Sequence, residues 1–210
     1  MAHRAVFFDL GGVVFDSPLA YITEFEAEHG LPPHFVARIV GGYGGPDGPW
    51  QKLERGDITL EDFCERFDRD ALAQEHALRT AELMRGMHGR FRPRPVMVAA
   101  IRKLREAGLR VAALTNNWVV GETYDAEMQP LRDEFHAFVE SCKVRMRKPD
   151  PRIFVHACEV LGVAPTESVF LDDIGENLKS ARKLGMTTIK VSEPEAALRE
   201  LGAALGLALP

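Results

Sequence analysis

Four short apolar runs constrain the fold of this chain more than any other feature. They are rich in Val, Ile, Leu and Phe, and they span 5–8, 110–115, 168–171 and 187–191. Apolar and polar residues do not alternate within them, which is typical of strands covered on both faces. A weaker fifth candidate spans 137–141. We therefore expect a sheet of four or five buried strands.

Helical patterns separate these runs. Apolar residues recur at helical spacing within 95–108, 150–162, 174–185 and 193–205. Strands that alternate with helices favour a doubly wound parallel sheet whose crossovers are right-handed. The sequence thus predicts an α/β fold with a Rossmann-like core.

One long segment breaks this rhythm. Four helical patterns follow one another with no convincing strand between them, at 18–30, 32–40, 59–72 and 74–87, and a glycine-rich loop occupies 41–50. The simplest interpretation is a helical insert after the first strand. We expect a core formed by 1–16 and 94–210, and an inserted helical unit over 17–93.

Composition excludes several classes of protein. A net charge of −5 and a pI near 5.8 argue against a general binder of nucleic acids or anionic membranes. No apolar run approaches the roughly 20 residues that a membrane span needs. The three cysteines form no CxxC pair, so neither a disulfide framework nor a zinc site is indicated. The first strand begins too early for a signal peptide, and we expect a cytoplasmic protein. The oligomeric state is not indicated.

Polar residues follow three of the predicted strands. Asp9 ends the first, 115–117 ("TNN") end the second, and Asp172 and Asp173 end the run at 168–171. Ligands bind beyond the carboxyl ends of the strands in open parallel sheets, so these residues are candidates for a site. A basic loop at 143–152 carries Lys148 and precedes a predicted helix.

Each of these residues also has a purely structural interpretation. Asp9 could begin a turn, Thr115 or the aspartate pair could cap a helix, and Lys148 could be a solvated charge. Their expected convergence argues otherwise, because each pair of carboxylates about 4 Å apart costs roughly 4 kcal/mol at an effective dielectric near 20. Such a cluster needs cations. Lys148 is one, and an all-oxygen ligand set favours Mg²⁺ as another.

Four motifs in a fixed order carry a resemblance to a known family. They are "DLGGV" (9–13), "LTNN" (114–117), "RKPDP" (147–151) and "FLDDIGENL" (170–178). Over nearly its whole length the chain resembles the haloacid dehalogenase (HAD) superfamily of aspartate-nucleophile phosphatases with a helical cap. The segment 45–63 makes it particularly similar to the N-terminal phosphatase domain of soluble epoxide hydrolases.

The resemblance implies a catalytic role for three of these residues. Asp9 would attack phosphorus and carry an aspartyl-phosphate intermediate. Thr115 and the backbone at Asn116 would hold the phosphoryl oxygens. Lys148 would neutralise their charge and hold Asp9 in place.

The same resemblance implies a magnesium site. Asp9, the backbone carbonyl of Gly11 and Asp173 would bind Mg²⁺, with Asp172 close by or acting through water. Asn177 lies one helical turn beyond the aspartates and would support them, although it could equally be an ordinary polar residue of its helix.

Gly11 departs from the family pattern. Most phosphatases of this family carry a second aspartate there, which protonates the leaving alcohol and later activates water. General acid–base catalysis typically contributes about 10²–10⁴-fold. With glycine at this position, the sequence assigns the task to no residue. Sequence alone therefore predicts that phosphate esters of acidic alcohols react better than simple alkyl phosphates.

Three alternatives stay open at this point. A haloacid dehalogenase needs neither metal nor acid, but its fourth motif has no double aspartate. A phosphonatase would use a cap lysine as a Schiff base, and Lys52 is the only lysine in the insert. A catalytically quiet binding module would explain Gly11 directly, yet it has no need of the other motif residues.

The expected substrate is a small phosphorylated molecule. The insert should close over the site and select the leaving group, and Trp50, Lys52 and Arg55 are the candidates for this selection, together with Tyr43. Trp118 follows "TNN" and could line the floor of the pocket.

Overall fold

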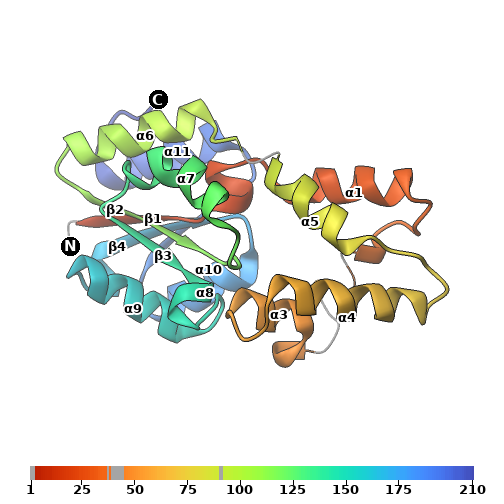
Figure 1. Cartoon of the computed structure of the whole chain (residues 1–210). Coiled ribbons are helices and arrows are strands. Elements are labelled where there is room, and N and C mark those ends of the chain that lie inside the picture. Colours follow the sequence, from red (N-terminus) through yellow and green to blue (C-terminus); the bar gives the residue numbers. More distant parts are fainter. Residues whose placement is uncertain (1–2, 37, 39–44, 90–91) are drawn as a thin grey trace.

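A five-stranded parallel sheet forms the centre of the larger of two parts (Figure 1). The computed structural model describes residues 3–36, 38, 45–89 and 92–210. The sheet order is β3-β2-β1-β4-β5, and all neighbouring strands are parallel. The strands are β1 (Ala5–Phe8), β2 (Arg110–Thr115), β3 (Ala137–Glu140), β4 (Ser168–Asp172) and β5 (Thr187–Lys190). The predicted α/β fold class is confirmed.

Helices cover both faces of this sheet, because alternate residues of each strand pack on opposite sides. In β1, Val6 and Phe8 contribute to one hydrophobic cluster, while Ala5 and Phe7 contribute to the other. The first cluster includes residues of α6 (Pro95–Glu106), α7 (Glu122–Arg132) and α11 (Pro194–Leu205). The second includes residues of α9 (Pro151–Leu161) and α10 (Gly175–Lys183). A short helix, α8 (Ser141–Val144), follows β3.

All five predicted strands are present, including the weak candidate, which forms β3. The strand expected over 168–171 continues to Asp172, so the first aspartate of the pair belongs to the strand itself. Helix α7 was not predicted. Its segment is rich in charges and contains Pro130, and among its described side chains only Met128 and Leu131 join the hydrophobic cluster as buried residues.

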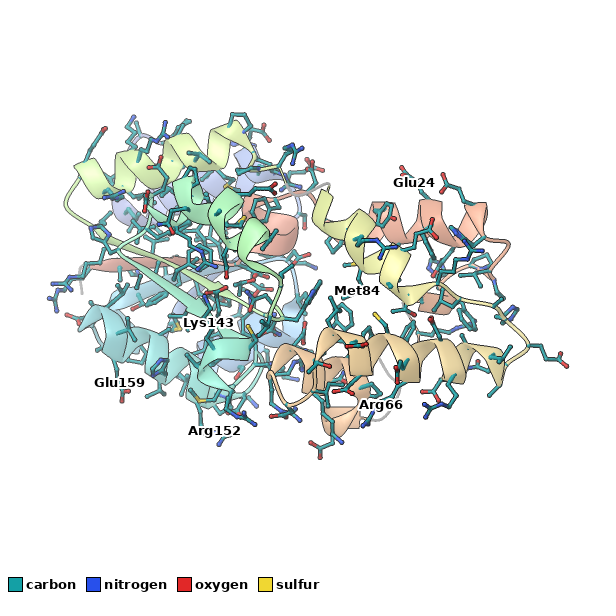
Figure 2. All side chains as sticks on the ribbon, in the orientation of Figure 1. Glu24, Arg66, Met84, Lys143, Arg152 and Glu159 are labelled. Atoms are coloured by element: carbon teal, nitrogen blue, oxygen red, sulfur yellow. The ribbon has the colours of Figure 1, made fainter. Side chains whose placement is uncertain are left out.

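The second part is a helical unit that lies beyond the carboxyl ends of the strands (Figure 1). It contains α1 (Pro18–Glu28), α3 (Pro49–Glu54), α4 (Leu60–Leu72) and α5 (Thr80–Gly89). A third hydrophobic cluster, with Phe25, Phe63 and Met84, holds these helices together, and it also includes Trp118 of the larger part. Figure 2 shows Met84 between the helices, whereas Glu24 and Arg66 project from the outer sides.

Two helices of this unit differ from expectation. The helix predicted over 74–87 begins only at Thr80, because the Asp68 carboxylate on α4 accepts hydrogen bonds from the Thr80 N–H (2.9 Å) and hydroxyl (2.5 Å). Helix α3 occupies sequence that was partly assigned to the glycine-rich loop. Of the helix predicted over 32–40, residues 35, 36 and 38 are helical and 32–34 are not; 37, 39, 40 and the loop at 41–44 lie outside the described residues.

The chain crosses between the two parts twice, and the crossings are bonded to each other. Phe15 and Pro93 form an antiparallel bridge, and the Arg94 N–H donates to the Val14 carbonyl (2.8 Å). The Arg94 guanidinium also pairs with Asp16 on the opposite crossing (3.0 Å). Arg94 thus ties the two connections together where the helical unit leaves the sheet.

Within the described ranges, no helix is both long enough and apolar enough to cross a lipid bilayer.

Candidate active site

Asp9 is fixed at the end of the central strand. Its N–H donates to the Leu171 carbonyl of the neighbouring β4 (2.9 Å), which extends the strand pairing by one residue. Its carboxylate accepts a hydrogen bond from the Leu10 N–H (2.7 Å), at the start of a tight turn over 10–14. The side chain is buried, but it lines a cavity beyond the sheet.

Lys148 lies between two carboxylates. Its ammonium is 2.9 Å from Asp9 and 2.7 Å from Asp172, and the side chain is only 1% exposed. Burial alone would lower the pKa of Lys148, but Asp172 and Asp9 outweigh it and hold this pKa above its usual value. The lysine therefore stays charged.

The side chain of Asn116 sets the position of this lysine. Its carbonyl oxygen accepts from the Lys148 N–H (2.8 Å), and its amide donates to the Lys148 carbonyl (3.0 Å). The loop after β2 and the basic loop are thereby locked together. The family resemblance implies that the backbone of Asn116 holds phosphoryl oxygens. The side chain of Asn116 has this second, structural role.

Asp9, Asp172 and Asp173 form an acidic cluster whose closest oxygens all lie within 4.8 Å of one another. Burial, with repulsion between these carboxylates, raises the pKa of Asp9 to about 8 and also raises the pKa of Asp173. The Asp173 Oδ1 atom is buried and has no hydrogen-bond partner among the described residues. Lys148 alone does not keep all three groups ionised, so the cluster fits a bound cation, which would lower the pKa values of Asp9 and Asp173.

The donor atoms indicate which cation would fit. The cluster offers only oxygens, which suit Mg²⁺ rather than zinc. Asp172 already accepts hydrogen bonds from Lys148, from the Asn177 amide (3.1 Å to each oxygen) and from the Ile174 N–H (2.7 Å). Asp9 and Asp173 therefore have the freer oxygens. Asn177, for which the family resemblance implies a supporting role, contacts Asp172 from α10.

The two glycines after the strand differ in their surroundings. Gly11 has ordinary backbone angles (φ −65°, ψ 126°), and within the described structure no atom lies within 4 Å of where a Cβ would be. Gly12 has φ 77°, and a Cβ there would be 2.2 Å from Asp173 Oδ2. Gly12 is therefore required by packing, whereas a Cβ would fit at Gly11.

Replacing Gly12 with alanine should displace Asp173 and strain the turn. We expect a loss of about 1–3 kcal/mol of unfolding free energy from the left-handed backbone. We also expect roughly 10–100-fold weaker Mg²⁺ binding, as for other changes that misplace a metal ligand. Urea unfolding and titration calorimetry measure the two effects. Gly11→Ala is the matched control, and equal losses in both variants would contradict this assignment.

A cavity of about 470 Å³ opens between the strand ends and the helical unit. Asp9, Thr115, Lys148 and Asp173 are among its polar lining residues. Both parts of the molecule contribute to an apolar wall, which includes Ile22, Trp50, Met87, Trp118, Val120 and Met128. The predicted position of Trp118 in the pocket agrees with this arrangement.

The helical unit contributes a different set of side chains from the one predicted. Trp50 lines the cavity, but Lys52 and Arg55 are not among the described residues that line it. Arg55 instead forms ion pairs with Asp47 (3.2 Å) and Asp57 (2.8 Å). Tyr43 lies outside the described residues.

Gln51 and Glu54 line the cavity instead, and sequence reasoning missed both. Positions 50, 51 and 54 share one face of a helix, whereas 52 points away from that face. Recognising a helix that begins at Pro49 would have revealed this grouping. Arg147 was also missed, although it precedes Lys148 directly and lines the same cavity.

Two mouse proteins show the similarity of this chain to known sequences. It is 39% identical over 220 residues to acyl-CoA dehydrogenase family member 10, covering 99% of this chain and 20% of that protein. It is 34% identical over 226 residues to bifunctional epoxide hydrolase 2, covering all of this chain and 40% of that protein. The chain thus spans well under half the length of these relatives.

A shorter relative matches from end to end. The sesquiterpene phosphatase of Aspergillus oryzae is 26% identical over 206 residues, covering 97% of both chains. Among solved structures, a HAD family enzyme of Bacteroides thetaiotaomicron in complex with magnesium and inorganic phosphate superposes with a TM-score of 0.64 at 23% identity, covering 90% of this chain and 94% of that one.

The family comparison agrees with the four motifs. The model of the haloacid dehalogenase-like hydrolases matches residues 3–185, which include every strand except β5 together with the whole acidic cluster. This chain therefore belongs to the haloacid dehalogenase-like hydrolases.

Proposed function

We propose that this hydrolase is a Mg²⁺-dependent phosphatase that cleaves a small phosphate monoester through an aspartyl-phosphate at Asp9. The proposal rests on the buried ion pair between Lys148 and Asp9, which lines the cavity and joins the cluster that Asp9 forms with Asp172 and Asp173. The phosphatase of Aspergillus oryzae and the magnesium and phosphate bound in the Bacteroides enzyme support it.

In the proposed reaction each of these residues has a distinct role. The Asp9 carboxylate attacks phosphorus and displaces the alcohol, and water later releases phosphate from Asp9. Lys148 holds Asp9 in position and neutralises the phosphoryl oxygens. The Thr115 hydroxyl and the Asn116 N–H hold those oxygens in line for attack. Mg²⁺, when bound by Asp9, the Gly11 carbonyl and Asp173, would offset the charge of the phosphoryl group.

In this proposal the helical unit, residues 17–93, is a cap that covers the cavity and selects the leaving group. Trp50 and the apolar wall then contact the alcohol part of the substrate. A Schiff-base mechanism at Lys52 has no support, because this lysine is not among the described residues that line the cavity.

Two other functions make different demands on the site. A dehalogenase would not need the Asp173 oxygen that is left without a partner, and a quiet binding module would not need the buried Lys148 pair. The Asp173 oxygen and the Lys148 ion pair both fit a metal-assisted transfer of a phosphoryl group. We therefore prefer the phosphatase function.

Hydrolysis of p-nitrophenyl phosphate should require Mg²⁺. EDTA should abolish it, and Asp173→Asn should reduce it strongly even at saturating Mg²⁺, because the variant loses a ligand with a free oxygen. A phosphatase assay with p-nitrophenyl, alkyl and sugar phosphates, with and without Mg²⁺, measures this. Asp57→Asn removes an exposed carboxylate outside the cluster and is the control. Activity that EDTA does not change would contradict the proposed role of the metal.

A further inference from the structure

Resting on the function just proposed, we propose that Glu54 of α3 donates the proton to the leaving alcohol, a task that Gly11 cannot perform because it has no side chain. The donor would then belong to the helical unit rather than to the loop after β1. This deepens the proposed function by assigning its missing acid.

Glu54 is placed on the same cavity as Asp9. Its side chain is buried, and it lines the cavity at the end of α3. Its backbone carbonyl accepts a hydrogen bond from the Ser141 hydroxyl (2.6 Å), whose oxygen in turn accepts from the Asn117 N–H (2.9 Å). Asn117 directly follows Thr115 and Asn116. Glu54 is thus anchored to the loop that would hold the phosphoryl oxygens.

The charges around Glu54 suit a group that gives up a proton during the reaction. Burial raises the pKa of its carboxyl group above the usual value, and hydrogen bonds from Arg147 and Trp50 offset part of this rise. The Arg147 Nε atom is 2.6 Å from Glu54 Oε2. The proton is therefore retained more readily than on an exposed glutamate, and the carboxylate formed after its loss has a cation beside it.

The other acidic side chains near the cavity are less suited to this task. Glu140 is bonded to Arg132 through both oxygens (2.8 and 2.9 Å), which helps to hold its pKa below the usual value despite burial. Glu176 is exposed on α10. Burial raises the pKa of Tyr124 to about 12, which makes it a weak donor. Asp16 pairs with Arg94 and is not among the described lining residues.

Glu54 would transfer a proton in each of the two steps of the reaction. A carboxylate oxygen of Asp9 forms a bond to phosphorus, and the bond between phosphorus and the leaving oxygen breaks. The electron pair stays on that oxygen, which takes the proton of the Glu54 carboxyl group and leaves as the alcohol. In the second step water attacks phosphorus and returns a proton to Glu54, which frees phosphate and Asp9.

Single-turnover formation of the phosphoenzyme tests this inference with two kinds of substrate. Simple alkyl phosphates need a proton donor, whereas p-nitrophenolate leaves without one. Glu54→Gln should slow phosphoenzyme formation from an alkyl phosphate by about 10²–10⁴-fold more than from p-nitrophenyl phosphate. Because only the first step is measured, a role of Glu54 in hydrolysing the intermediate does not affect the measured rate.

Two control variants separate proton donation from a structural role. Asp57→Asn breaks another contact between the two parts, the ion pair with Arg145 (2.9 Å). Tyr124→Phe removes the competing hydroxyl. Both should keep the wild-type ratio between the two substrates. Adding Gly11→Asp to Glu54→Gln should restore the alkyl reaction, since a Cβ at this position meets no described atom outside the local turn within 4 Å.

Equal slowing of both substrates by Glu54→Gln would overturn the inference and make Glu54 a purely structural contact. If Tyr124→Phe changed the ratio between the two substrates and Glu54→Gln did not, the inference would also be overturned, and Tyr124 would be the proton donor. If the wild-type protein forms no phosphoenzyme even from p-nitrophenyl phosphate, the proposed function itself fails, and that outcome is distinct from both.

Discussion

Replacing Asp9 with asparagine should reduce hydrolysis of p-nitrophenyl phosphate by roughly 10⁴-fold or more, as expected when a covalent nucleophile is removed. Asparagine has the same shape but is not a nucleophile toward phosphorus. The fold should persist, because Lys148 keeps its ion pair with Asp172 at 2.7 Å. Steady-state assays and thermal unfolding, both with Mg²⁺, check the two parts of this expectation.

Asp16→Asn is the matched control for this prediction. Asp16 lies on the crossing that follows the same turn, is exposed, and pairs only with Arg94 among the ion pairs of the described structure. Its variant should retain most of the activity. If Asp9→Asn kept a rate within tenfold of the wild type, Asp9 would not be the nucleophile.

Removal of the Lys148 charge should have the largest effect on stability. Lys148→Met should lower the unfolding free energy by about 3–5 kcal/mol in the absence of Mg²⁺, because Asp9 and Asp172 lose the cation between them. Saturating Mg²⁺ should recover part of this loss by binding the same carboxylates. Urea unfolding with and without Mg²⁺ measures both quantities.

Lys143→Met is the comparison variant. Lys143 also pairs with a buried carboxylate, Glu140, at 2.6 Å, but its own side chain is 55% exposed, and Arg132 also contacts that carboxylate. Its loss should cost less than about 1 kcal/mol. A similarly small cost for Lys148→Met would show that the acidic cluster is neutralised in some other way.

The parallel sheet could be predicted because its signal is local. Residues 5–8 and 168–171 form strands whose two faces are both covered by helices. Such strands are apolar without alternation, so their burial can be predicted from the sequence of each segment alone. The carboxyl ends of parallel strands meet at one edge, so the approach of Asp9 and Asp173 followed from topology alone.

The features that sequence missed depend on contacts between distant segments. Helix α5 begins at Thr80 because Asp68, on another helix, accepts its hydrogen bonds. The ion pair of Glu54 could not be recognised, because its partner Arg147 lies 93 positions away. Lys52 and Arg55 were chosen for their charge, whereas the register of α3 decides which side chains reach the cavity.

Direct detection of a phosphorylated Asp9 tests the central claim most directly. The protein would be mixed with an activated phosphate ester and Mg²⁺, quenched in acid within one turnover, digested and analysed by mass spectrometry. We expect one phosphoryl group on the peptide that contains Asp9, labile to base and missing in Asp9→Asn. Full hydrolysis of the substrate with no phosphoryl group on this peptide at any quench time would contradict the mechanism.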